Sequence, residues 1–166
     1  MSEGPAGGPD SRPDKPREQP ADPSAAPRES AEPAHTADTH QLYQRGLDLL
    51  GRGSPAAAAQ LLQRAAVAEP RSRSIREALA RAQFDTGQYA AAADNFRLIV
   101  EASPSDDYAQ FGLGLALART GDQSGAAEHL ALAAAMRPNL RHYTDALRSV
   151  RATLQARREP PRERGD

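Results

Sequence analysis

The chain has 166 residues, no cysteine and a formal net charge of −1. It is long enough for one domain, and it cannot form a disulfide, a thiolate metal site or a cysteine nucleophile. No segment carries the roughly 18 consecutive apolar residues that a spanning helix needs, and the first residues lack the apolar core of a signal peptide. We therefore expect a soluble, cytoplasmic protein that does not associate with membranes.

Residues 1–38 are predicted to form a disordered, acidic leader rich in proline and alanine. They contain eight of the 14 prolines, eight acidic and four basic side chains, and almost nothing apolar except alanine. Such a segment buries too little apolar surface to offset its conformational entropy. A solubilising spacer is the simpler interpretation, and a linear motif for a partner is the alternative. Residues 158–166 are predicted to form a disordered tail on the same grounds.

Three kinds of residue recur between these tails with a period of 34. The recurring positions are Pro70, Pro104 and Pro138; Gly53, Gly87 and Gly121; and Ala58, Ala92 and Ala126. Because they share one period and one phase, the sequence divides into three repeat units, 39–72, 73–106 and 107–140.

Each unit predicts a hairpin of two helices, and the chain is therefore predicted to be all-α. The first helices, 39–52, 73–86 and 107–120, end at the recurring glycine, which adopts the left-handed conformation without strain. The second helices, 55–69, 88–102 and 122–136, end at the recurring proline. Ser54 and Asp122 are predicted N-caps. Small residues are expected where the two helices of a hairpin cross, namely Gly46, Ala80 and Gly114. Stacking of the three hairpins buries the apolar faces of the hairpins.

Residues 141–157 are predicted to form a capping helix that closes the array. Tyr143, Leu147, Val150 and Leu154 follow one side of it at helical spacing, with arginines between them. An apolar face for the last hairpin and a polar face for water are what the end of a repeat array requires.

The repeated positions resemble the tetratricopeptide repeat family. Leu113-Gly114 and Leu117, followed by Ala126, Leu130 and Pro138, match the family pattern. Tryptophan is absent, and Arg76 and Gln110 stand at its position. The resemblance implies a right-handed superhelix of three helix-turn-helix hairpins plus the C-terminal capping helix. The pentatricopeptide family, which reads RNA, has a different period. Residues 39–157 hold 14 basic and 11 acidic side chains, a net charge of +3 that is too weak to indicate nucleic-acid binding.

The resemblance also implies a concave groove, lined by the first helices, that holds a peptide or helix of a partner protein. The residues expected to face this groove are Tyr43, Leu47, Glu77, Arg81, Phe84, Asp85, Tyr108, Phe111 and Leu115. The alternative for Tyr108 and Phe111 is packing against neighbouring helices only. Some family members clamp a C-terminal carboxylate, but the corresponding positions here, such as Tyr43 and Leu47, do not match that clamp.

No pattern indicates an enzyme, a metal site or a cofactor. The four histidines, His35, His40, His129 and His142, lack metal-ligand spacing. Asp106 and Asp107 are interpreted as favourable charges at the start of a helix.

The function predicted from the sequence is that of an adaptor for one protein partner. The alternative is self-association through the capping helix, with Tyr143, Leu147 and Leu154 at the interface, so the chain is expected to be a monomer or to self-associate weakly. Two clusters of arginines are interpreted either as solvated faces or as contacts for an acidic partner. One cluster lies at positions 71, 73 and 76, and the other at 148, 151, 157 and 158.

Overall fold

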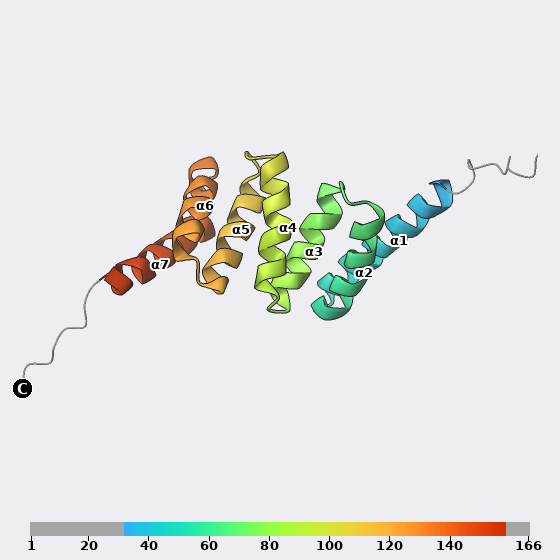
Figure 1. The fold of residues 1–166 in the computed structure, drawn as a ribbon, viewed down its shortest axis with the longest axis horizontal. Coiled ribbons are helices and arrows are strands. Elements are labelled where there is room, and N and C mark those ends of the chain that lie inside the picture. The colour runs from blue at the N-terminus through green and yellow to red at the C-terminus, as the bar shows by residue number, and fades with distance from the viewer. Residues whose placement is uncertain (1–31, 159–166) are drawn as a thin grey trace, which may run out of the picture. The chain divides into compact units, whose positions relative to one another are not determined.

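The computed structural model describes residues 32–158, with side chains from residue 36 onward, and within this range it contains seven α-helices and no strand. The helices are α1 (Glu32–Gly51), α2 (Pro55–Ala68), α3 (Arg73–Asp85), α4 (Tyr89–Ala102), α5 (Asp107–Thr120), α6 (Gln123–Met136) and α7 (Arg141–Arg158). Each packs against the helix before it, so the hairpins follow one another in a row (Figure 1). The predicted all-α hairpin array with a terminal helix is confirmed. Most of the predicted leader and nearly all of the predicted tail lie outside the described residues.

The first helix is longer than the sequence analysis predicts. It begins at Glu32 rather than at residue 39, so residues 32–38 of the predicted leader are helical. Pro33 stands in the first turn, where its fixed φ favours a helix start, and alanines follow it. The average composition of the leader concealed this local signal.

The turns inside the hairpins are closed by the recurring glycines. Gly53, Gly87 and Gly121 have φ angles of 73°, 79° and 98°, as the sequence predicts. Asp122 caps α6, because its side chain accepts a hydrogen bond from the Gly125 amide at 2.9 Å. Ser54 is the N-cap residue of α2, as predicted, with Pro55 in the first turn, but its side chain makes no capping hydrogen bond.

Small residues bring the two helices of a hairpin into close contact. Ala58, Ala92 and Ala126 are fully buried, and so is Ala80. A Cβ atom at Gly114 would lie 2.7 Å from Leu130 Cγ and 3.1 Å from the Ala126 carbonyl oxygen. The missing side chain therefore sets how closely α5 and α6 approach.

Polar side chains replace the tryptophan of the repeat in the second unit. Arg76 donates to Asn95 Oδ1 at 2.9 Å and also to the Pro70 carbonyl of the preceding unit. Asn95 in turn donates to Gln83 Oε1 at 2.8 Å. A single side chain thus joins the helices of its own hairpin and ties them to the hairpin before.

The third unit uses the same arrangement with different residues. Gln110 Nε2 donates to the Pro104 carbonyl at 2.9 Å, and Gln110 Oε1 lies 2.7 Å from His129 Nδ1. Because the amide oxygen of Gln110 accepts, His129 Nδ1 is the donor. Burial lowers the pKa of His129.

Gly114→Ala is expected to lower the free energy of unfolding by about 1–3 kcal/mol, because the added methyl group overpacks the contact with Leu130. Gly51→Ala is the matched control, since nothing lies within 4 Å of a Cβ there. It should leave stability unchanged or raise it by up to about 1 kcal/mol. Urea unfolding followed by circular dichroism measures both, and equal effects of the two substitutions would contradict the packing.

His129 is expected to make stability pH-dependent. Its folded pKa lies below the ordinary value of 6.5, so the unfolded chain takes up the proton first, and the free energy of unfolding falls as the pH drops below that value. His129→Gln retains a donor for Gln110 and cannot titrate. Unfolding curves between pH 5 and pH 8 should show the wild type losing stability relative to this variant, and parallel profiles would refute the assignment.

Candidate functional site

The nine residues predicted to face a groove lie on α1, α3 and α5 and line two adjoining depressions. Arg81, Phe84, Asp85, Tyr108, Phe111 and Leu115 line the first, which has a volume of about 220 Å³. Tyr43, Leu47 and Glu77 line the second, of about 140 Å³. Arg81 lines both, so the depressions are neighbours. We call the two depressions together the groove.

Two further residues form part of the first depression, and the sequence analysis did not assign them to it. Phe96 belongs to α4 and is only 2% exposed, yet its ring reaches the depression beside Gly112. A Cβ at Gly112 would lie 2.5 Å from Phe96 Cζ, so the ring fits only because residue 112 is a glycine. The Phe96 ring meets Tyr108 edge to face, with centroids 6.2 Å apart. The repeat pattern places Phe96 in the core, which concealed this second role. The glycine at position 112 is the sequence signal that could have indicated it.

The charged residues of the groove differ in how they are compensated. Arg81 is exposed and makes no ion pair with any residue that the structure describes. Burial raises the pKa of Glu77, and the Arg73 guanidinium partly opposes that shift. Burial likewise raises the pKa of Tyr108, which keeps 36% of its surface exposed. Of the two arginines that line the groove, Arg73 is ion-paired and Arg81 is not, within the described residues.

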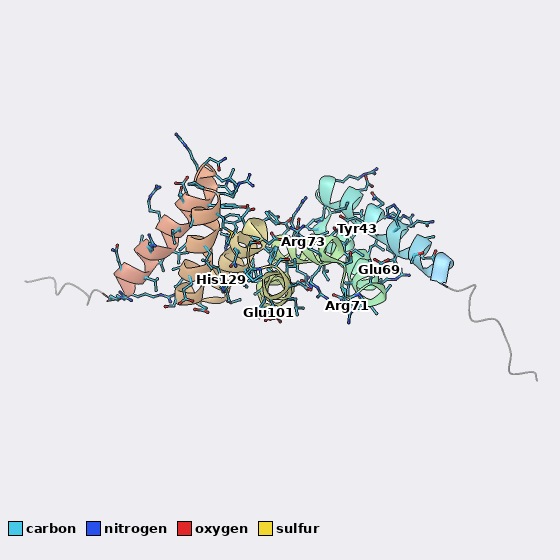
Figure 2. The ribbon with its side chains drawn as sticks, turned by 90° about the horizontal axis from the view of Figure 1, so that it is seen from above. Tyr43, Glu69, Arg71, Arg73, Glu101 and His129 are labelled. Carbon is cyan, nitrogen blue, oxygen red and sulfur yellow. The ribbon has the colours of Figure 1, made fainter. Side chains whose placement is uncertain are left out.

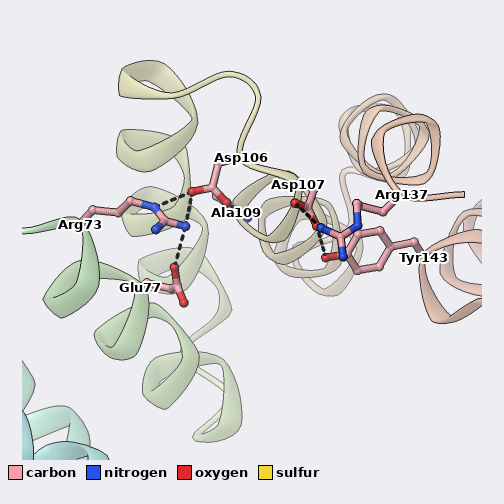
Figure 3. Close-up of polar contacts among 7 residues, drawn as sticks. All are labelled: Arg73, Glu77, Asp106, Asp107, Ala109, Arg137 and Tyr143. Atoms are coloured by element: carbon pink, nitrogen blue, oxygen red, sulfur yellow. Dashed lines mark hydrogen bonds and ion pairs between the residues drawn. The ribbon is translucent and has the colours of Figure 1, made fainter. Parts of the chain in front are cut away.

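An arginine of α3 holds the start of α5 in place (Figure 3). Arg73 Nε donates to Asp106 Oδ2 at 2.6 Å, and its Nη2 lies 3.1 Å from Glu77 Oε2. The other oxygen of Asp106 accepts from the Ala109 amide at 3.1 Å and caps α5. The interpretation of Asp106 as a favourable charge at a helix start is confirmed, and its bond to the preceding hairpin was missed.

The capping helix is docked by a tyrosine. Tyr143 Oη donates to Asp107 Oδ2 at 2.9 Å (Figure 3). Its ring stacks on Phe111 with centroids 4.4 Å apart, and His142 meets the edge of Phe111 at 5.3 Å. Burial, and secondly the hydrogen bond to Asp107, raise the pKa of Tyr143. Phe111 therefore packs against a neighbouring helix and also lines the groove.

The burial of Tyr143 corrects one expectation about self-association. The sequence analysis placed this residue at a possible interface between copies, but only 2% of its surface is exposed. Leu147 and Leu154 are partly buried beside α6. Tyr143 therefore serves the contact within the chain, and it is not available to a second copy.

Residues 32–158 lack two further kinds of feature. No helix there is long and apolar enough to cross a membrane. No group of three or more histidine, aspartate or glutamate side chains in this range is placed to hold a metal ion.

Comparison with known proteins identifies the family. The tetratricopeptide repeat family matches residues 43–107 and 101–140, together more than half of the chain, and the chain belongs to this family. No curated protein matches the chain.

Solved structures show the same fold. The first TPR domain of Spaghetti (RPAP3), bound to an HSP90 peptide, is 20% identical with a TM-score of 0.67, over 72% of this chain and 94% of that one. The Sgt2 TPR domain of Aspergillus fumigatus is 24% identical with a TM-score of 0.67, over 77% and 88%. MamA from Desulfovibrio magneticus is 22% identical with a TM-score of 0.68, over 71% and 67%. At these identities the likeness concerns the fold alone.

Tyr143→Phe is expected to lower the free energy of unfolding by about 1 kcal/mol, because it removes the hydrogen bond to Asp107 and keeps the stacked ring. Tyr89→Phe is the matched control, since the Tyr89 hydroxyl bonds to no residue in the described range. Chemical unfolding compares the two, and an equally small effect of both substitutions would show that Asp107 does not stabilise the docked helix.

Proposed function

We propose that this protein is a protein-interaction module that binds a peptide segment of a partner, extended or helical, in the groove. The supporting observation is that the two adjoining depressions bring apolar side chains from three first helices around Arg81, which is exposed and makes no ion pair within the described residues. Aromatic and arginine side chains in a concave surface are the anchors that dominate peptide recognition.

The chemistry of the groove suggests what the peptide carries. Tyr43 and Leu47 offer an apolar contact in one depression, and Tyr108, Phe111 and Leu115 offer a second in the other. Arg81 separates them. A segment with two apolar anchors and an acidic or carbonyl-rich stretch between them fits this order.

The RPAP3 domain, bound to an HSP90 peptide, supports peptide binding as a use of this fold. The clamp for a terminal carboxylate is not matched in this chain. We therefore propose recognition of an internal segment of the partner.

The proposal assigns no catalytic role. Glu77 has Arg73 as its ion-pair partner. The groove also holds Ser74, Asp85 and two tyrosines, and no histidine is among the described residues that line it to act as a base for these hydroxyl groups. Binding, and the recruitment of one protein by another, is the function that these side chains support.

The test is a selection of peptides from a displayed random library on the full-length chain, followed by fluorescence anisotropy of the selected peptides. Arg81→Glu and Tyr108→Ala are expected to weaken binding at least tenfold. Both side chains are exposed, so the fold should survive, and circular dichroism checks this. Phe111 is left in place because it stacks on Tyr143.

Arg64→Glu is the matched control, because it makes the same change of charge at an exposed, unpaired arginine on α2. It should leave the affinity unchanged. Selected peptides that bind the two groove variants as tightly as the wild type would exclude the groove as the binding site.

A further inference from the structure

A second concavity lies outside the groove, between the α2–α3 turn and the end of α4. Its volume is about 360 Å³, larger than either depression of the groove. Arg71 comes from the turn, and the last residues of α4 form the opposite wall. Arg71 and Glu101 lie along one edge of the ribbon in Figure 2, and Tyr43 of the groove lies toward the other. We call this concavity the arginine cavity.

The arginine cavity is lined by three arginines and by no acidic residue. Arg73 is neutralised by Asp106 and Glu77. Arg76 is half-buried, and its bonds within the described chain go to neutral acceptors only, an asparagine oxygen and a backbone carbonyl. Arg71 is exposed and has no ion pair there. A half-buried positive charge without a counter-ion is costly, and an incoming carboxylate would reduce that cost.

The rest of the wall is apolar except for Ser103. Leu98 is 48% exposed at the mouth of the cavity, and Ile99, 3% exposed, lies beside it. An exposed leucine beside uncompensated arginines offers contact to an aliphatic side chain that carries an acidic neighbour.

The combination of leucine and arginines is not imposed by the repeat. One period later, Leu132 is again exposed, at 47%, but the three arginines correspond to a serine, an aspartate and a glutamine. The next junction therefore has the apolar element without the charge. The positive cavity belongs to the junction between the first and second units alone.

We propose that the arginine cavity is a second binding site, which takes an acidic peptide segment with a leucine-like side chain next to a carboxylate. The aliphatic side chain packs on Leu98 and Ile99, and the carboxylate pairs with Arg71 and Arg76. A nucleic acid fits less well, because Leu98, Ile99 and Ala102 make the wall beside the arginines largely apolar. The site is independent of the groove.

The test uses a short, capped synthetic peptide of alternating aspartate and leucine and the ¹⁵N-labelled full-length chain. Amide shifts are expected to change in residues 71–76 and 98–103. By fluorescence anisotropy, Arg71→Gln and Leu98→Ser should each weaken binding at least tenfold. Both positions are exposed, and thermal melts check that the variants fold. Leu132→Ser, the matched control one period later, should leave the affinity unchanged, and so should Arg81→Glu in the groove.

Several results would overturn the proposal. They are the absence of binding at millimolar peptide, equal binding of a peptide with lysine in place of aspartate, and unchanged affinity of Arg71→Gln. Amide shifts confined to the groove would assign the peptide to that site instead. Binding of a single-stranded oligouridylate that is lost in Arg71→Gln, without binding of the peptide, would make the cavity a nucleic-acid site.

Discussion

The close approach of the two helices in each hairpin is the constraint on which the rest of this structure depends. Gly46 packs against Leu62, and Gly114 packs against Leu130. In both units the leucine belongs to the second helix and follows the glycine by sixteen residues. In the middle unit, the same spacing pairs Ala80 with Phe96. The larger ring extends beyond its own hairpin to Gly112 of the next, and this shapes the floor of the first depression. A packing requirement of the repeat thus determines the geometry of the groove.

The absence of tryptophan has a consequence for charge. An indole at positions 76 and 110 would fill its space with apolar surface. Gln110 replaces it with a neutral network, whereas Arg76 replaces it with a network that carries a positive charge. The same guanidinium that ties the first unit to the second therefore lines the arginine cavity. Stability and ligand chemistry are coupled at this residue, which is why the proposed test alters Arg71 and leaves Arg76 unchanged.

Features set by neighbouring residues could be predicted from the sequence, and features set by the rotation of stacked helices could not. The period of 34 and the turn glycines come from local patterns, so the hairpins and their order followed from the sequence. The nine groove residues were predicted from their positions in the repeat, as the family resemblance implies. The structure brings them together, and their use in binding stays a prediction. The bond from Arg73 to Asp106 and the bond from Tyr143 to Asp107 join residues 33 and 36 positions apart. Such contacts depend on how one hairpin is turned on the next, which periodicity does not specify.

Arg73 explains how the two proposed binding sites can lie so close together and still be separate. It lines both the arginine cavity and the second depression of the groove. Its charge is already taken up by Asp106 and Glu77, so it offers little attraction to a ligand on either side. Each proposed site has its own exposed arginine without an ion pair in the described part of the chain: Arg81 in the groove and Arg71 in the cavity. Because Arg71 lines only the cavity and Arg81 only the groove, an anionic group held by one does not remove the charge that attracts a ligand to the other.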